Sequence, residues 1–310
     1  MASPYGIDIL IATYNGARTW PAMLDALTLL EPPQRPIRYL VVDNGSTDGT
    51  RALLETWAGR LPITLLSCPE PGKMAALHLG ANALSGDLTL MTDDDILPCP
   101  GWLRAYEAAA DAHPEAVLFG GPILPQPFEP LDPWYEHVDG FRDVLFALTD
   151  EPEGPVNAVA KVFGPNYLVR TPQAREMLLA PSKLGPTRGN RFPLGDETQM
   201  IAGLAQAGGR FWYARGAQVR HLVRRHYTSL DYMLTRAERH GRGHVILNVQ
   251  GGGDWRGRGG WLISSAAHAA KQALEAAFLD RSRPDARVFE RLYRYHWNLG
   301  AMRGAVLGPY

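Results

Sequence analysis

The chain has 310 residues, of which 45% are hydrophobic and 20% charged, and its formal net charge is -1 at pH 7. This composition is typical of a globular protein with one large α/β domain or two smaller ones, and it excludes a disordered chain. The balanced charge does not favour binding to nucleic acid, so we expect no nucleic-acid partner. Cys68 and Cys99 lack the spacing of a zinc site or a disulfide framework, which favours a reducing, cytoplasmic setting.

The sequence also predicts that the chain does not cross a membrane. Asp8 interrupts the first apolar run, which argues against a signal peptide. No apolar stretch reaches the ~18 residues that a transmembrane helix needs. Peripheral contact with the inner face of a membrane stays open, through an arginine-rich stretch from Arg210 to Arg242 or through a predicted helix over 261–278. Packing of that helix onto the domain is the alternative.

Strands and helices alternate in the N-terminal third of the chain. Apolar runs predict strands over Ile7–Ala12, Ile37–Val42, Ile63–Ser67 and Leu88–Thr92. Apolar residues at helical spacing predict helices over 20–30, 53–57 and 73–84. This alternation is typical of a largely parallel sheet with right-handed crossovers. Ligands of such sheets bind beyond the carboxyl ends of the strands.

The remaining two thirds of the chain have a less regular pattern. The expected elements are an amphipathic helix over 134–148, a strand pair within 159–169, a helix over 172–179, a loop over 183–191, a helix over 195–206 and a strand over 211–219. The glycines between 251 and 260 indicate either a flexible lid or a linker.

The strongest single feature is the predicted strand over 88–92, because it ends in Asp93, Asp94 and Asp95. Three adjacent carboxylates repel one another unless a cation or a set of donors neutralises them. Oxygen ligands of this kind suit Mg²⁺ or Mn²⁺, which in turn bind phosphate oxygens. The alternative is a solvated acidic turn in which Asp95 caps a helix that starts near Pro98.

An ordered series of motifs adds to this feature. It comprises Ala12-Thr13-Tyr14-Asn15, the run from Val41 to Asp48, Pro71-Gly72-Lys73, Gly86-Asp87, Thr92-Asp93-Asp94-Asp95 with Gly101-Trp102-Leu103, and Gly195-Asp196-Glu197. In order and spacing this series resembles the family 2 glycosyltransferases, which have the GT-A fold.

The resemblance implies the fold and the domain organisation. Residues 1–245 would form a GT-A domain with a Rossmann-like, mostly parallel central sheet flanked by helices. Within it, 6–118 would bind the nucleotide sugar, and 119–245 would bind the acceptor and carry the catalytic base. Residues 246–310 would form a helical C-terminal extension.

The resemblance also implies an enzyme of the hexosyltransferase type. It would move a sugar, with inversion, from a nucleotide-diphosphate donor, a UDP-sugar being favoured, to a hydroxyl of a glycan, a glycolipid or a lipid-linked acceptor. Polysaccharide biosynthesis is the usual setting of the family. Two alternatives stay open: a nucleotidyltransferase, and a non-catalytic sugar- or nucleotide-binding protein on the same fold.

The donor-site residues follow from the same resemblance, motif by motif. Those expected to contact the nucleotide sugar are Thr13, Tyr14, Asn15, Asp43, Asn44, Lys73, Asp87, Asp93 and Asp94. Asp95 would contact the Mn²⁺ or Mg²⁺ that bridges the diphosphate. His221 would approach that metal, or it would be a structural histidine.

The catalytic base is expected in the Gly-Asp-Glu motif, because attack on the donor sugar needs a carboxylate that takes the acceptor's proton. The motif departs from the more frequent Glu-Asp order of the family. Position by position, Glu197 matches the base and Asp196 its neighbour, although Asp196 could instead cap the helix. Arg224 and Arg225 would reach the diphosphate or an anionic acceptor, with a solvated basic surface as the alternative.

Overall fold

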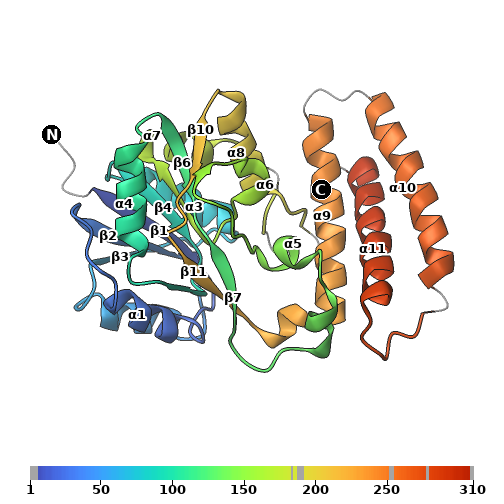
Figure 1. Cartoon of the computed structure of the whole chain (residues 1–310), viewed down its shortest axis with the longest axis horizontal. Helices are drawn as coiled ribbons and strands as arrows, with labels where there is room; N and C mark the ends of the chain where they lie inside the picture. Colours follow the sequence, from blue (N-terminus) through green and yellow to red (C-terminus); the bar gives the residue numbers. More distant parts are fainter. Residues whose placement is uncertain (1–5, 183, 187–191, 251–254, 277–278, 308–310) are drawn as a thin grey trace. The chain divides into compact units, whose positions relative to one another are not determined.

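A computed structural model describes residues 6–182, 184–186, 192–250, 255–276 and 279–307. Its largest feature is an eight-stranded mixed sheet in the order β3-β2-β1-β4-β9-β6-β10-β8, flanked by helices (Figure 1). Its strands are β1 (Ile7–Thr13), β2 (Ile37–Asp43), β3 (Ile63–Ser67), β4 (Leu88–Thr92), β6 (Ala116–Gly120), β8 (Gly154–Pro155), β9 (Tyr167–Arg170) and β10 (Arg210–Tyr213). The neighbours β3, β2, β1 and β4 are parallel, whereas β9 runs antiparallel to both β4 and β6. The α/β fold predicted from the sequence is confirmed.

Most of the helices that precede β10 lie where apolar residues recur at helical spacing. They are α1 (Trp20–Thr28), α2 (Thr50–Trp57), α3 (Lys73–Ala83) and α4 (Trp102–Ala112), followed by α5 (Arg142–Phe146), α6 (Ala158–Lys161), α7 (Thr171–Leu179) and α8 (Asp196–Gln206). Pro21 fits the first turn of α1 because the N–H that it lacks would have no intrahelical partner there. The helices predicted over 20–30, 53–57, 73–84, 172–179 and 195–206 are confirmed, with small shifts at their ends.

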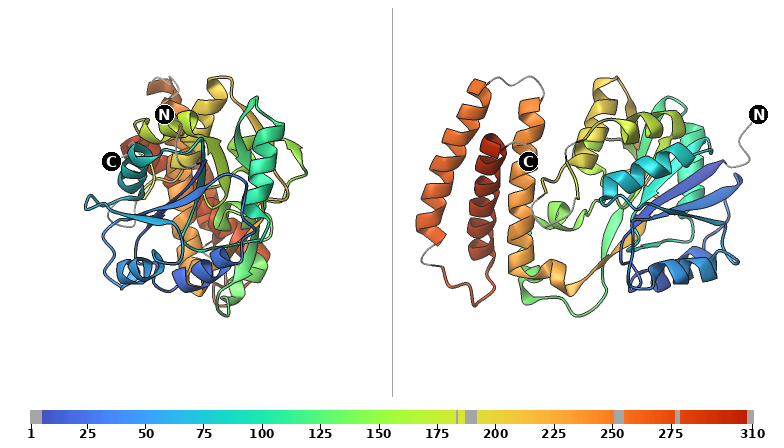
Figure 2. Two further views of the ribbon diagram at one scale, coloured as in Figure 1. Left: turned by 90° about the vertical axis from the view of Figure 1, so that its left-hand side faces the viewer. Right: turned by 180° about the vertical axis from the view of Figure 1, so that it is seen from behind.

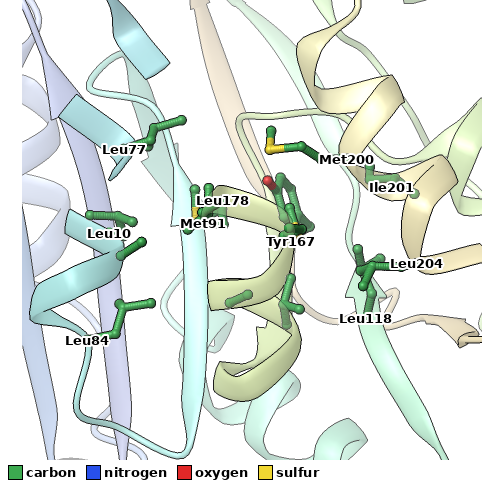
Figure 3. Close-up of a cluster of buried hydrophobic side chains, with 14 of the residues drawn as sticks. Leu10, Leu77, Leu84, Met91, Leu118, Tyr167, Leu178, Met200, Ile201 and Leu204 are labelled. Carbon is green, nitrogen blue, oxygen red and sulfur yellow. The ribbon is translucent and has the colours of Figure 1, made fainter. Parts of the chain in front are cut away.

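One hydrophobic core lies between the sheet and the helices α3, α7 and α8 (Figure 3). Leu10 on β1 and Met91 on β4 contribute apolar side chains from the sheet, and Leu204 contributes one from α8. Gly80 lets α3 come close to β1, because a Cβ atom there would lie 2.4 Å from Leu10 Cδ1. Close packing of this kind holds the carboxyl ends of the strands in fixed register.

The strand pair predicted within 159–169 is wrong in its first half, which is the short helix α6. The cause lies in Asn166, which is fully buried instead of forming an exposed hairpin turn. Its side-chain oxygen accepts hydrogen bonds from Trp102 Nε1 (2.8 Å) and Tyr106 Oη (2.9 Å). Its amide nitrogen donates to the carbonyls of Pro122 and Ala217. The four bonds satisfy the buried amide and fix the entry to β9.

Two further predictions need correction. The strand predicted over 211–219 is two strands in different sheets, β10 and β11 (Val219–Val223). β11 is the central strand of a small sheet with β5 (Ile96–Pro98) and β7 (Ile123–Pro127). The helix predicted over 134–148 is interrupted at Gly140, whose φ of +82° leaves the helical region, so a 3₁₀ turn (Pro133–His137) and α5 replace it.

By its internal contacts the chain divides into two compact units. The first comprises the described residues within Met1–Gln126, Ala147–Pro181 and Met200–Leu222, and the second those within Pro127–Phe146, Ser182–Gln199 and Val223–Tyr310. The domain boundary predicted after residue 245 stays a prediction.

Most of the second unit is three long helices, α9 (Leu230–Gln250), α10 (Trp255–Ala276) and α11 (Ala286–Leu307). α11 lies side by side with α9 and with α10 (Figure 1, and the right-hand view of Figure 2). The predicted helix over 261–278 is therefore part of α10, as far as residue 276. None of the described helices is long and apolar enough to span a bilayer. Two predicted segments lie partly outside the described residues. They are the glycine-rich lid or linker, at 251–254, and the loop, at 183 and 187–191.

Candidate active site

The candidate site is built where β1, β2 and β4 end. In the parallel register Thr13 lies opposite Asp43, and Ile11 lies opposite Thr92. The residues that follow these strands are therefore brought to one edge of the sheet, where Thr13, Asp43 and the three aspartates meet, as the sequence predicted.

Asp94 is tied to the end of β1. The Thr13 hydroxyl donates a hydrogen bond to Asp94 Oδ2, and Trp20 Nε1 in turn donates to Thr13 Oγ1 at 3.0 Å. Gly16 makes room for this arrangement, because a Cβ atom there would lie 2.4 Å from Asp94 Oδ2. Trp20 was expected only as an apolar residue of its helix. Its polar role could not be predicted, because it depends on where the indole N–H points.

Asp93 forms an ion pair with Lys73, whose Nζ lies 2.9 Å from Asp93 Oδ1. Lys73 is the first residue of α3, and it follows Gly72, which has a φ of +123°. The Asn44 side chain accepts a hydrogen bond from the Gly72 N–H at 2.7 Å and donates to the carbonyls of Cys68 and Glu70. Asn44 therefore fixes the loop that presents Lys73.

Asp95 lies beside His221, with His221 Nε2 3.4 Å from Asp95 Oδ1. The register of the small sheet explains this pairing, because β11 runs antiparallel to β5 and places His221 opposite Ile96. The Leu222 N–H also donates to the Asp95 carbonyl at 2.8 Å. Asp95 and His221, distant in the sequence, thus form a carboxylate–imidazole pair that is mostly buried.

The loops after β1 and β2 are held together by side chains predicted to bind the donor. Asn15 Oδ1 accepts from the Thr47 N–H at 2.8 Å, and the Asn15 N–H donates to Ser46 Oγ. Asp43 is buried and accepts from the Ser46 N–H. Tyr14, by contrast, is 63% exposed, so its ring is open to a planar ligand.

Asp48, which was not among the predicted site residues, also connects these loops. Its carboxylate accepts hydrogen bonds from the Ala17 N–H and from Thr50. Asp48 is exposed, so the slight desolvation that opposes its ionisation is outweighed by these hydrogen bonds, which lower its pKa. Asp48 therefore stays an anion that holds the loop on which Asn15 and Tyr14 lie.

Asp87 is not brought to this cluster. It is an exposed residue immediately before β4, at the amino end of a strand whose carboxyl end carries Asp93. Five residues of β-strand span roughly 16 Å. The buried carboxylate at that end is Asp8, which pairs with Arg38 and accepts from the N–H groups of Ser85 and Gly86.

Asp196 and Glu197 form the first turn of α8, in the second unit. Asp196 is buried, and a Cβ atom on Gly185 would lie 2.7 Å from its Oδ2. Glu197 is only partly buried. Of the two, Glu197 is therefore the carboxylate that an acceptor could reach more easily.

Arg224 and Arg225 make contacts within the second unit. The Arg224 guanidinium lies 4.4 Å from the centre of the Tyr227 ring and donates to its hydroxyl. The Arg225 N–H donates to Glu129.

The metal-binding side chains at the edge of the sheet fit a divalent cation that is coordinated partly by the protein and partly by a bound substrate. Within the described ranges, no three His, Cys, Asp or Glu side chains converge as a complete metal cage. Asp95 and His221 supply two convergent donors. A metal bound by one or two protein groups and by substrate phosphates is the usual arrangement for Mg²⁺ and related ions.

Comparison with known proteins identifies the fold. In the solved structures, a mannosyltransferase of Pyrobaculum calidifontis in complex with GDP-Man and Mn²⁺ superposes with a TM-score of 0.59 at 20% identity, over 98% of this chain and 89% of that one. The 1–349 fragment of S. aureus TarS in complex with UDP-GlcNAc gives a TM-score of 0.54 at 15% identity, over 76% and 66% of the two chains. The fold is that of the GT-A glycosyltransferases.

The sequence comparisons define the family. The sequence model of the family described as Glycosyl transferase family 2 matches residues 8–163, about half of the chain. The succinoglycan biosynthesis protein ExoM of Rhizobium meliloti is 25% identical over 283 residues, which cover 87% of this chain and 79% of that protein. This chain belongs to glycosyltransferase family 2, and it is an enzyme of the glycosyltransferase class.

Proposed function

We propose that this enzyme transfers a sugar, with inversion, from a nucleotide-diphosphate donor to a hydroxyl group of a glycan, a glycolipid or a lipid-linked acceptor, assisted by Mn²⁺ or Mg²⁺. The observation that carries the proposal is the convergence of Thr13, Lys73 and the three aspartates at the carboxyl edge of the sheet. GDP-Man with Mn²⁺ and UDP-GlcNAc, which are bound in the two similar structures, support a nucleotide-sugar donor.

The donor site follows from the geometry of the edge. The exposed Tyr14 ring would stack on the base, and the buried Asp43 would accept hydrogen bonds from the base or the ribose. Lys73 would exchange its contact with Asp93 for one with the diphosphate, which frees Asp93 to bind the ribose or the sugar.

Asp95 and His221 would hold the cation. When bound, a divalent cation offsets the negative charge that develops on the leaving nucleoside diphosphate. Glu197 is the proposed base and would take the proton from the acceptor hydroxyl as it attacks the donor sugar from the opposite face. Asp196, which is buried, would hold the turn that positions Glu197.

The acceptor is a separate part of the proposal. The similarity to ExoM, a succinoglycan biosynthesis protein, supports a growing polysaccharide or its lipid-linked precursor. The arginine-rich stretch is the proposed site of peripheral contact with an anionic membrane surface.

The proposal is tested by a thermal-shift screen of UDP-, GDP- and dTDP-sugars, each with and without Mn²⁺. A ligand that binds only the folded state raises the melting temperature, so one nucleotide sugar should stabilise the enzyme more in the presence of metal. With Asp95→Ala, the shift caused by that donor should no longer depend on Mn²⁺. An unchanged Mn²⁺-dependent shift in this variant would contradict the metal assignment. Absence of any shift with the wild type would contradict a UDP-, GDP- or dTDP-sugar donor and would favour an unusual donor, such as a lipid-linked sugar.

A further inference from the structure

A cavity of about 460 Å³ lies within the second unit, between α10 and α11. Its apolar wall is made by four aromatic side chains, Phe141, Trp261, Tyr293 and Trp297. Pockets for small ligands typically measure about 300–1,000 Å³ and combine aromatic walls with a few polar groups. The volume and the wall are therefore those of a ligand site, which the donor chemistry described above does not use.

The helical repeat explains how the wall forms. On α10, Trp261, His268 and Gln272 recur at intervals of seven and four residues, so they lie on one face of the helix. On α11, Tyr293 and Trp297 are four residues apart and share a face in the same way. Because α10 and α11 lie side by side (Figures 1 and 2), the two faces line the cavity, which is open to solvent.

Contacts behind the wall hold the aromatic rings in place. His244 on α9 touches both indoles, with ring centres 5.3 Å from Trp261 and 5.3 Å from Trp297. The centre of the Phe141 ring lies 4.4 Å from that of Tyr293. Both indoles remain partly exposed. Rings that are fixed before binding lose little conformational entropy when a ligand stacks on them.

The polar part of the wall retains hydrogen-bonding capacity. Asn298 Nδ2 donates to Gln272 Oε1 at 3.1 Å and to the Arg294 carbonyl at 2.9 Å. Among the described residues, the Gln272 amide nitrogen and the Asn298 side-chain oxygen contact no protein partner. Two donor hydrogens and one acceptor oxygen thus lie side by side for a ligand that both donates and accepts.

The charges near the cavity decide the class of ligand. Among the described lining residues, Arg294 is the one that is always charged, and its guanidinium pairs with Glu290 at 2.9 Å. A strongly anionic ligand would have to compete with this pair. An apolar lipid chain would cover the amides of Gln272 and Asn298 without satisfying them, which costs free energy.

We propose that this cavity binds a neutral saccharide. Apolar C–H faces of a pyranose ring would stack on the indoles of Trp261 and Trp297, while its hydroxyl groups would bind the amides of Gln272 and Asn298. Assigning this saccharide to the acceptor glycan rests on the proposed function, whereas saccharide binding itself does not.

The experiment measures binding by the full chain in the absence of nucleotide sugar and metal. Cellotetraose and maltotetraose, two neutral glucose oligosaccharides, are titrated and followed by saturation-transfer NMR. We expect binding of at least one of them. Trp261→Ala and Trp297→Ala should each weaken it at least tenfold, and Gln272→Leu, which retains side-chain bulk, should weaken it severalfold.

Matched controls separate this site from the fold and from the donor site. Trp57→Ala removes a partly buried indole from α2, in the first unit, and should leave saccharide affinity unchanged. Asp95→Ala should also leave it unchanged while removing the metal-dependent donor shift.

Three results would overturn the proposal: no binding of either tetrasaccharide at millimolar concentration, binding that survives both tryptophan substitutions, or tryptophan-dependent binding of farnesyl phosphate in place of the sugars. None of these results depends on the change in melting temperature caused by the nucleotide-sugar donor. Failure of this proposal can therefore be distinguished from failure of the proposed transfer reaction.

Discussion

At the scale of single residues, the candidate site depends on the close packing of backbone and side-chain atoms as much as on the charges of its aspartates. Asp94 is fixed by a hydroxyl whose other partner is a buried indole, and Gly16 provides the space between them. Because interiors are close-packed, even one added methyl group must displace something.

Gly16→Ala should therefore impair donor binding. The added Cβ would lie 2.4 Å from Asp94 Oδ2 and 2.8 Å from Trp20 Cδ1, and the carboxylate gives way more easily than the buried ring. We expect donor affinity to fall by about tenfold, or ~1.4 kcal/mol. Gly59→Ala is the control, because no atom lies within 4 Å of that added Cβ. Equal donor affinities of the two variants, measured by calorimetry, would show that Gly16 does not position Asp94.

The choice of base is a second prediction at this scale. Glu197→Gln should leave donor binding intact and lower the transfer rate by about 10²-fold or more, because the amide cannot take a proton. Asp196→Asn should mainly lower the melting temperature, since Asp196 is buried beside Gly185. A folded Asp196→Asn enzyme that binds donor but does not turn over would reverse the assignment.

At the scale of elements, the crossing of α9 and α11 is set by glycines. A Cβ atom on Gly241 would lie 1.9 Å from the Trp297 carbonyl oxygen, and one on Gly300 would lie 1.9 Å from the Glu238 carbonyl oxygen. The two backbones thus touch directly, which no larger residue allows.

Gly241→Ala should destabilise the second unit by about 1–3 kcal/mol, the usual cost of overpacking. Gly203→Ala on α8 is a matched control, because its Cβ would meet no atom within 4 Å. Alanine is the better helix former, so this control should be neutral or stabilising by up to ~1 kcal/mol. Urea unfolding followed by circular dichroism compares the two. Equal stability of both variants would mean that α9 and α11 can separate at little cost.

Runs of apolar residues and turn signals were sufficient to predict the strands that depend only on such local sequence patterns. The strands over 7–12, 37–42, 63–67 and 88–92 formed within a residue of their expected ends, since each is a short apolar run between turn signals. The strand pair within 159–169 failed because Asn166 is buried by partners distant in the sequence. No local pattern carries that information.

The same distinction holds for the candidate site. The convergence of the aspartates and Lys73 was predictable because they directly follow predicted strands or precede a helix at the edge where ligands bind, and their roles stay a prediction. Asp87 precedes the strand predicted over 88–92, so its position at the opposite end of that strand follows from the sequence, and only the resemblance groups it with the donor-site residues. The pairing of His221 with Asp95 was suggested by the resemblance, but its physical cause is the register of a small sheet. That register depends on contacts between segments that are far apart in the chain.

At the scale of the whole molecule, the division into two compact units means that acid need not unfold the chain in one step. The second unit contains a group that makes it sensitive to acid. Burial lowers the pKa of His240 to about 3, with smaller contributions from the charges of Arg236 and Arg239. On its other side the ring faces the hydroxyl of Tyr293.

The direction in which pH changes the free energy of unfolding follows from the different pH values at which the folded and unfolded states take up a proton. Unfolded His240 would take up a proton as the pH falls through about 6.5, whereas the folded form stays neutral until about pH 3. The stabilisation is complete above pH 6.5 and is lost as the pH falls toward 3. One proton that only the unfolded state takes up changes the free energy of unfolding by at most ~1.4 kcal/mol per pH unit, and we expect a loss of about 1 kcal/mol per pH unit for His240.

His240→Gln should reduce this dependence, while His244 on the same helix, whose pKa burial also lowers, should retain part of it. The free energy of unfolding of this variant is measured by urea unfolding at pH 6.5, 5.5 and 4.5. It should fall less steeply with decreasing pH than that of the wild type, even where the variant is less stable at pH 6.5. His268→Gln, an exposed histidine on α10, should retain the wild-type slope. Because the two units can unfold separately, the near-ultraviolet signal of the tryptophans on α10 and α11 should follow the acid-sensitive step. Parallel pH profiles for wild type and His240→Gln would place the acid sensitivity elsewhere in the chain.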